Sequence, residues 1–254
     1  MQGMLSVMLT PATVAIRYPV RPSPEAWILP EGTVPESPVH DEVAEGLKLL
    51  LRAWATRSPS KLRIARNLAI RFDEQNPRVG IDPDVCVLAP PPDDLDELGS
   101  LCLWKPGHTP PPLCFEIVST SHPNKDYVAI QDRYAALGTR ELFVFDPMLA
   151  GPKSLGGPVP LQLWRRDASG GYDRVHFGAE PIFSEVLGAW VIAEGRSLFI
   201  ADDREGTQRW LDEAALQRAE AVRARAEADQ ERRAREALER ELSALKARVT
   251  LGSE

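Results

Sequence analysis

The chain has 254 residues, of which 43% are hydrophobic and 26% charged, and its formal net charge is −7. This is enough for one sizeable globular domain with an appendage. The acidic balance argues against a protein that coats nucleic acid non-specifically, because phosphate contacts require Lys and Arg. Because no apolar run reaches the roughly 18 residues that a membrane-spanning helix needs, we expect no membrane partner.

The three cysteines predict a reducing compartment. Their spacing forms no metal-type pair, and an odd number argues against a closed set of disulfides. Cys86 and Cys114 lie in apolar runs, where cysteine serves as a small core residue. These features favour a cytoplasmic protein.

The chain divides by composition into three parts. Residues 1–24 are predicted to be a flexible leader, because the stretch lacks the basic start of a signal peptide and is interrupted by Pro11 and Arg17. Residues 25–202 are assigned to a folded domain. Residues 203–254 are rich in Ala, Arg and Glu, which favours one long helix.

The first elements of the domain are a helix and a strand. An amphipathic helix of about fifteen residues follows His40, with Asp41 as its N-cap or first-turn acid. Its apolar stripe consists of Val43, Leu47, Leu50, Leu51 and Trp54. Residues 62–74 then alternate between apolar and polar side chains, which predicts one half-buried strand.

Three short apolar runs, each bounded by Pro, Gly or Asp, predict buried strands in one sheet: Val85–Leu88, Leu113–Val118 and Leu142–Phe145. Residues 89–112 between the first two are predicted to form a surface loop. A helix from about Asp126 to Leu137, ending at Gly138, separates the last two.

Two acids in these runs are candidate metal ligands. Asp84 lies at the mouth of the first run, and Glu116 lies within the second. Because an ionised carboxylate in a buried strand is costly unless it is paired, Glu116 indicates a bound cation or a catalytic role. Carboxylates on neighbouring strands can share a divalent cation. Alternatively, Asp84 is a turn residue and Glu116 faces solvent.

The last part of the chain predicts a hairpin, a closing element and a tail. Leu161–Trp164 and Tyr172–Phe177 pair as the hairpin, and residues 184–202 add one strand with a capping turn or short helix. In the tail, Leu238, Leu242, Leu245 and Val249 follow the spacing of a coiled-coil seam. Continued backwards, the seam is mostly Ala and is interrupted by charge. A coiled-coil homodimer and a solvated single helix both remain open.

The central motifs resemble a known family. Pro83–Asp84, the strand Glu116–Ser119, then Asp126, Tyr134 and Gly138 in a helix, and finally Phe145–Pro147, are similar to the Uma-two restriction endonucleases of the PD-(D/E)XK nuclease superfamily. The resemblance covers roughly residues 25 to 200. It implies an α/β, restriction-endonuclease-like core with a mixed sheet flanked by helices. It also implies Mg²⁺-dependent cleavage of DNA, with Mn²⁺ as a substitute and with Asp84 and Glu116 as metal-binding catalytic acids.

The resemblance departs from the family at the catalytic lysine. The family position, four residues after Asp126, is Ile130, and the older superfamily position, two residues after Glu116, is Val118. Lys125 is the nearby candidate, but in a regular helix it lies about 140° around the axis from Ile130. It reaches the site only if the helix begins irregularly.

The first helix supplies further candidates. His40 matches a family histidine, and it is either a capping residue or part of the site. Glu42 or Glu45 could supply an acid to the site, and the sequence does not choose between them. A basic cleft formed by Arg63, Arg66, Arg71, Lys125 and Arg133 would favour contact with DNA.

These observations predict a Mg²⁺-dependent endonuclease with weakened activity, which Ile130→Lys would raise if water reaches the new charge. The alternative is an inactive nuclease fold that binds a partner or nucleic acid and oligomerises through its C-terminal helix.

Overall fold

The structure is a computed structural model that describes residues 14–16, 20–29, 37–94 and 99–251, with the backbone alone for 242–251. The chain forms two compact units, Met1–Trp210 and Leu211–Glu254. No helix within the described ranges is long and apolar enough to cross a membrane.

The first unit consists mainly of strands. They are β1 (Ala15–Ile16), β2 (Arg63–Arg66), β3 (Ile70–Arg71), β4 (Gly80–Ile81), β5 (Val85–Leu88), β6 (Leu101–Cys102), β7 (Leu113–Ile117), β8 (Glu141–Phe145), β9 (Leu161–Arg166), β10 (Tyr172–Gly178), β11 (Ile182–Ser184), β12 (Ala189–Glu194) and β13 (Ser197–Ala201). The helices are α1 (Pro38–Arg57), the π-helical turn η2 (Lys125–Ala129), α2 (Gln131–Leu137), the 3₁₀ turn η3 (Lys153–Leu155) and, in the second unit, α3 (Glu213–Leu251).

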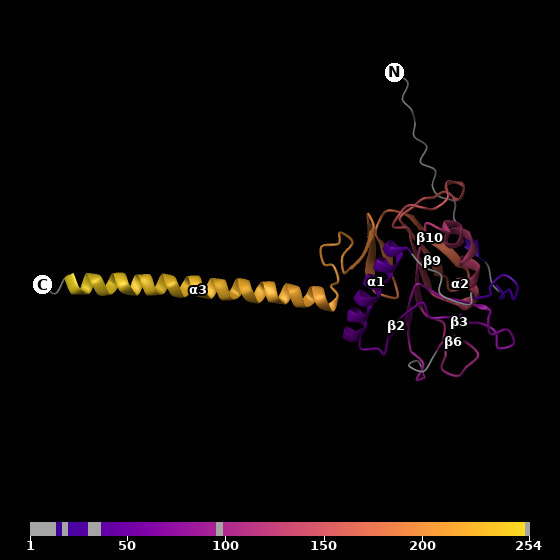
Figure 1. Ribbon diagram of the computed structural model, residues 1–254, viewed down its shortest axis with the longest axis horizontal. Coiled ribbons are helices and arrows are strands. Elements are labelled where there is room, and N and C mark those ends of the chain that lie inside the picture. The colour runs from indigo at the N-terminus through magenta and orange to yellow at the C-terminus, as the bar shows by residue number, and fades with distance from the viewer. Residues whose placement is uncertain (1–13, 17–19, 30–36, 95–98, 252–254) are drawn as a thin grey trace, which may run out of the picture. The chain divides into compact units, whose positions relative to one another are not determined.

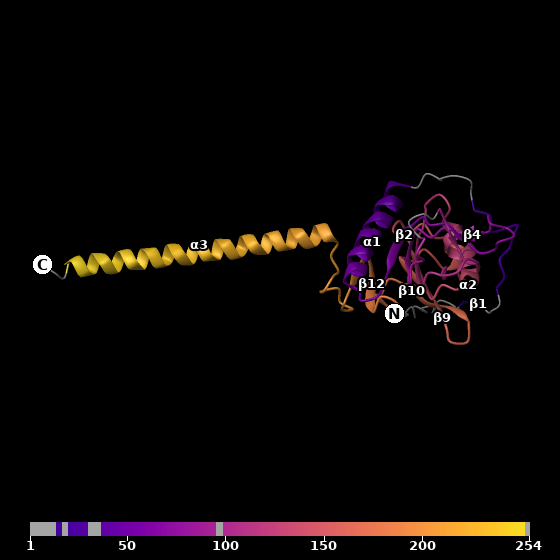
Figure 2. The same cartoon turned by 90° about the horizontal axis from the view of Figure 1, so that it is seen from below.

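A seven-stranded mixed sheet with the order β1-β10-β9-β8-β7-β5-β2 forms the centre of the first unit. Its pairs are antiparallel except for the parallel pair β7–β8. A parallel pair needs a crossover connection, and η2 and α2 provide it. Figure 1 and Figure 2 show α1 on one side of this sheet and α2 on the other. The architecture confirms the predicted α/β class, with a mixed sheet flanked by helices.

The central strands alternate their side chains between two buried layers, as expected for a sheet covered on both faces. Val87 and Phe115 point towards α1 and the three-stranded sheet β11-β12-β13. Cys86 and Cys114 point towards α2 and the three-stranded sheet β4-β3-β6. The continuous apolar runs in the sequence reflect this double coverage.

Helix α1 begins where a side chain caps its first turn. The Ser37 hydroxyl accepts a hydrogen bond from the His40 N–H (3.3 Å), and Asp41 lies in the first turn. On the apolar stripe, Leu47 and Leu51 are buried against the sheet. Because the N-terminus of α1 is held in this way, His40 is carried to the sheet edge where Asp84 lies.

Several predicted elements differ from the structure. Residues 62–74 form two strands in different sheets, because Asn67 has a left-handed φ of +50° that turns the chain between β2 and β3. The closing stretch forms the antiparallel sheet β11-β12-β13, with Gly195 (φ +58°) in the turn between its last two strands. The predicted loop at 89–112 contains β6, which pairs with β3. Residues 95–98 of that loop are outside the described residues.

The predicted boundaries also differ. Ala15–Ile16, within the predicted leader, pair with β10, whereas residues 1–13 and 17–19 lie outside the described ranges. At the other end, the first unit continues past residue 202 to Trp210. The indole of Trp210 stacks on that of Trp54 at 5.8 Å between centroids, and its N–H donates to Asp202 Oδ1 (2.7 Å). The backbone N–H of Trp210 donates to the Ile200 carbonyl (2.8 Å). These contacts join the chain up to Trp210 to the first unit.

Candidate active site

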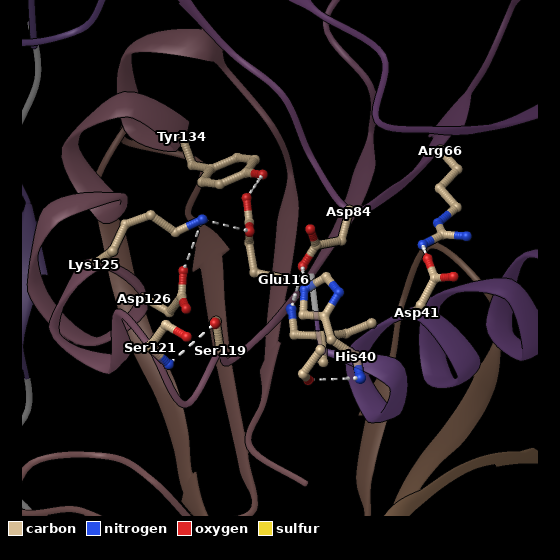
Figure 3. Close-up of polar contacts among 12 residues, drawn as sticks. His40, Asp41, Arg66, Asp84, Glu116, Ser119, Ser121, Lys125, Asp126 and Tyr134 are labelled. Carbon is tan, nitrogen blue, oxygen red and sulfur yellow. Dashed lines mark hydrogen bonds and ion pairs between the residues drawn. The ribbon is translucent and has the colours of Figure 1, made fainter. Parts of the chain in front are cut away.

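Asp84 and Glu116 lie side by side on neighbouring strands. Asp84 directly precedes β5 and Glu116 is in β7, and because Val85 pairs with Phe115 in an antiparallel register, the two acids are opposite each other. Both are buried, with 6% and 1% of their surface exposed. Both side chains lie on the face of the sheet that η2 and α2 cover (Figure 3). The predicted pairing of these two acids is therefore present.

Asp84 is held by the backbone of β7 and by α1. Its Oδ2 accepts hydrogen bonds from the Ile117 N–H (2.6 Å) and from His40 Nε2 (3.0 Å). His40 is itself buried. The N-cap of α1 is Ser37, to which His40 donates its backbone N–H, so His40 is not the capping residue, and its ring contacts the acid.

Glu116 has one satisfied and one unsatisfied oxygen. The Tyr134 hydroxyl, from α2, donates a hydrogen bond to Oε1 at 2.5 Å, whereas Oε2 is buried with no hydrogen-bond partner among the described residues. Lys125 Nζ lies 3.7 Å from Oε2. Burial raises the pKa of Glu116 well above its ordinary value, and the Lys125 charge opposes that rise.

The π-helical turn η2 brings Lys125 to the acids. Lys125 and Asp126 are its first two residues, so the segment does not begin as a regular α-helix. The Lys125 Nζ lies 3.3 Å from Asp126 Oδ1 in addition to its contact with Glu116. The neighbouring Glu116 charge raises the pKa of Lys125 above its ordinary value, so this side chain stays protonated. Figure 3 shows Lys125 between the two carboxylates.

Asp126 is a fully buried acid that sequence reasoning used as a landmark but gave no role. Apart from the ion pair of Oδ1 with Lys125, its carboxylate oxygens have no hydrogen-bond partner among the described residues. Burial raises its pKa to about 6. A buried acid beside two others is typical of a functional site, because burial of unsatisfied carboxylates costs stability.

The family model described as "Uma2: Putative restriction endonuclease" matches residues 16–193. The chain belongs to the Uma2 family. This confirms the resemblance inferred from the motifs around Asp84 and Glu116.

The other comparisons add little. Among solved structures, the chain is similar to one described as a putative nuclease belonging to DUF820 from Anabaena variabilis ATCC 29413. The sequence identity is 12%, the TM-score is 0.42, and the match covers 61% of this chain and 76% of that one. None of the curated proteins compared with the chain matches it.

The two positions where a Uma2 or superfamily lysine was expected are apolar and buried. Ile130 and Val118 are each 2% exposed and belong to the cluster that also contains Tyr134. Between η2 and α2, the Gln131 side chain donates to the Asp126 carbonyl (2.9 Å). The cation beside Glu116 is therefore Lys125, which meets the condition set by the sequence, an irregular start of the helix.

The predicted basic cleft is divided. Arg66 pairs with Asp41 and Glu45 on α1, and Arg71 bonds to the Ser100 hydroxyl and the Pro77 carbonyl. Arg133 donates to the Ala26 carbonyl (2.9 Å). It also lies near Glu116 and Asp82, whose charges oppose the lowering of its pKa by burial. Lys125 and Arg133 are thus the basic residues next to the acids.

Glu42 and Glu45, the two acids of α1 considered from the sequence, are not part of the group around Asp84 and Glu116. Glu45 pairs with Lys48 at 3.0 Å and with Arg66 at 3.4 Å, and Glu42 is exposed. Within the described part of the chain, no group of three or more His, Cys, Asp and Glu side chains is arranged to hold a metal ion. Asp84 and Glu116 therefore stay the predicted acidic ligands.

The donor atoms nevertheless suit a hard divalent cation. The paired carboxylates of Asp84 and Glu116 are oxygen donors, and Oε2 of Glu116 is buried without a hydrogen bond. Mg²⁺ is usually bound through one or two carboxylates, with water and substrate phosphate as its other ligands. Two acids therefore fit the coordination habits of Mg²⁺.

Proposed function

We propose that the protein is a Mg²⁺-dependent DNA endonuclease of the PD-(D/E)XK type in which Asp84 and Glu116 bind the metal and Lys125 supplies the catalytic positive charge. Mn²⁺ is expected to replace Mg²⁺. The observation that carries the proposal is the 3.7 Å separation of Lys125 Nζ and Glu116 Oε2, which puts a cation beside the acids although both usual lysine positions are apolar. Membership of the Uma2 family supports it.

The protein's own residues would prepare the site before the substrate arrives. The Ile117 N–H and His40 hold Asp84, and the Tyr134 hydroxyl orients Glu116. These contacts fix both carboxylates without rearrangement during the reaction. When bound, Mg²⁺ supplies a water of lowered pKa and stabilises negative charge on the phosphate oxygens.

Lys125 would act as an electrostatic group and not as a base. Because Glu116 raises its pKa, the ammonium keeps its proton at neutral pH. About half of the side chain is exposed, so it can meet a phosphate that enters from solvent. A protonated amine there stabilises the charge that develops on the phosphoryl oxygens.

Plasmid nicking in Mg²⁺ or Mn²⁺ tests the proposal. Lys125→Met should lower the rate by roughly 10²–10³, the loss seen when one well-placed stabilising group is removed. Glu116→Gln should abolish cleavage. Lys48→Met, which removes a lysine paired with Glu45 on α1, is the matched control and should cut like the wild type.

The outcomes separate the proposal from its alternative. Cleavage that survives Glu116→Gln would assign the activity to a contaminant or to a different site. A folded wild type that shifts DNA in a gel but never cuts it would favour the alternative, a binding protein with a nuclease fold. This alternative is supported by the apolar residues at both usual lysine positions, Ile130 and Val118.

A further inference from the structure

Helix α3 (Glu213–Leu251) presents no buried face within its own unit. From Glu213 to Glu241 its residues are exposed except for Ala215 and Asp229, which are half-buried. Val222 and Leu238 are 70% and 66% exposed. Most helices gain stability by packing an apolar face, so an exposed helix of 39 residues suggests a partner.

The heptad frame that starts from Leu238 assigns every residue of α3 to a position. The a and d positions form the seam: Ala214, Gln217, Ala221, Ala224, Ala228, Glu231, Arg235, Leu238, Leu242, Leu245 and Val249. The seam is mainly alanine in its first half and leucine or valine in its last part. This frame in turn defines the flanking positions g and e.

Four acid-to-base pairs occupy the flanking positions. Each has Glu at g and Arg or Lys five residues later at e: Glu213 and Arg218, Glu220 and Arg225, Glu227 and Arg232, and Glu241 and Lys246. We call these residues the g–e ladder. Five residues correspond to about 140° around one helix, so the two members of a pair cannot meet within one chain.

A second copy of the chain brings the two members of each pair together. In a parallel coiled coil, the g residue of one helix lies beside the e residue of the next heptad in the other helix. Every pair of the g–e ladder is then attractive, on both sides of the dimer. Among the residues whose side chains the structure describes, Glu220 and Glu227 have no ion-pair partner within 4 Å, so both are available to a second chain.

An antiparallel coil does not bring the g and e residues of the ladder together. In that arrangement g residues face g residues and e residues face e residues. If the seam is aligned so that Glu231 of one chain meets Arg235 of the other, Glu227 lies against Glu241 and Arg218 against Lys246. These are like charges, which are unfavourable when they are directly opposed. The same alignment opposes Glu220 to Arg248 and Arg225 to Glu239, so the antiparallel coil mixes repulsion with attraction, whereas all four pairs of the g–e ladder are attractive in the parallel coil.

We infer that two copies of the chain associate through α3 as a parallel, in-register, two-stranded coiled coil. Glu231 and Arg235 interrupt the seam: in register each meets its own copy, which costs stability at these two layers, and a heptad slip would place Glu231 against Leu238. Polar seam residues reduce stability but specify register. The inference concerns assembly and holds whether or not the protein cleaves DNA.

Disulfide trapping in the full chain tests the orientation. Ala214→Cys puts a thiol in the seam near the start of α3, where it meets its own copy in a parallel coil and faces the far end of the helix in an antiparallel one. Ala219→Cys, at the outward f position, is the matched control. The native thiols Cys86, Cys102 and Cys114 are buried, so the wild type should not cross-link.

We expect a dimer mass by light scattering and efficient cross-linking of Ala214→Cys but not of Ala219→Cys under mild oxidation. A single-chain or larger mass for the wild type overturns the inference. A dimer in which Ala214→Cys fails to cross-link overturns the parallel orientation.

Charge reversal tests the g–e ladder itself. Glu220→Arg combined with Glu227→Arg should weaken association about tenfold or more, because four interchain pairs become repulsive. Adding Arg225→Glu and Arg232→Glu to the same chain reverses every affected pair and should restore wild-type association. Association that is unchanged by the first pair of substitutions, or that is not restored by the second, would show that the ladder does not mediate dimerisation.

Discussion

Glu116 shows how the site reconciles burial with charge. Its strand neighbours are all buried, and one carboxylate oxygen has no hydrogen-bond partner among the described residues. The ammonium of Lys125 and the hydroxyl of Tyr134 stabilise the ionised form against the cost of burial. A carboxylate placed in this way is stable only with a cation nearby, and this is why its position in an apolar run signalled a functional site.

The surroundings of Ile130 do not suit a catalytic lysine. The side chain is buried in the apolar cluster between α2 and the sheet, so Ile130→Lys would bury an unpaired amine. We expect a loss of about 3 kcal/mol or more in the free energy of unfolding, measured by urea denaturation.

The control is Ile130→Met, which conserves volume and should cost less than about 1.5 kcal/mol. If Ile130→Lys is as stable as the wild type and nicks plasmid faster, water reaches this position. The original expectation from the sequence would then hold.

The pKa of Asp126 makes stability depend on pH. Because burial raises its pKa from 3.8 to about 6, the folded state keeps a proton that the unfolded state loses between these values. The folded state is therefore progressively disfavoured as the pH rises through this window, and the penalty is complete above about pH 6. Asp126→Asn removes the penalty.

In metal-free buffer, Asp126→Asn should unfold at higher urea than the wild type at pH 8. The difference should be on the order of 3 kcal/mol, since one pKa unit corresponds to about 1.4 kcal/mol. It should shrink towards zero by pH 3.5. A wild type that equals or exceeds the variant at pH 8 would mean that Lys125 fully compensates the buried charge.

At the level of the elements, the small sheet β4-β3-β6 depends on a glycine. A Cβ on Gly80 would lie 2.2 Å from the Ile70 carbonyl oxygen, in the strand that pairs with it. Gly80→Ala should therefore separate β4 from β3 and cost about 2 kcal/mol, as overpacking does. Thermal unfolding measures the change.

Gly46→Ala is the opposite case. Gly46 lies inside α1, and an added Cβ has no neighbour within 4 Å. Alanine lowers the entropy of the unfolded chain and favours helix, so this variant should be stabilised by about 0.5–1 kcal/mol. A destabilised Gly46→Ala variant, or a neutral Gly80→Ala variant, would contradict the packing of these two elements.

The elements differ in how far the sequence predicts them. The runs that became β5, β7 and β8 were recognisable because both of their faces are buried and their ends carry turn residues. The break at Asn67 was not recognisable, because apolar and polar residues keep alternating through it although β2 and β3 belong to different sheets. The π-helical form of η2 was also not predicted, because its spacing differs from an α-helix by one residue per turn over a single turn.

The residues of the candidate site also differ in how well the sequence predicts them. Asp84 and Glu116 were predictable from acids in apolar runs, and their pairing followed from the order of the strands. Asp126 and Tyr134 required the helix to be placed on the sheet, and the contact of His40 with Asp84 joins residues 44 positions apart. Such contacts depend on tertiary packing, which a local pattern does not contain.

At the scale of the whole molecule, the domain boundary was set by contacts across the chain. Trp210 belongs to the first unit because it stacks on Trp54 of α1, although its own neighbourhood in the sequence is as polar as the tail. Likewise, Ala15–Ile16 join the sheet because β10 offers an edge. Composition changes locate a linker only approximately when single aromatic or strand residues anchor the chain beyond it.

The acid-to-base spacing of α3 has a consequence for symmetry. A parallel, in-register coil possesses a twofold rotation axis that runs between its helices, and the first units of the two copies are both joined to the N-terminal end of that coil. The two strands of a DNA duplex are likewise related by twofold axes, which lie perpendicular to the duplex. If the two axes coincide, each copy meets one strand with the same polarity, and palindromic sites become equivalent for both copies.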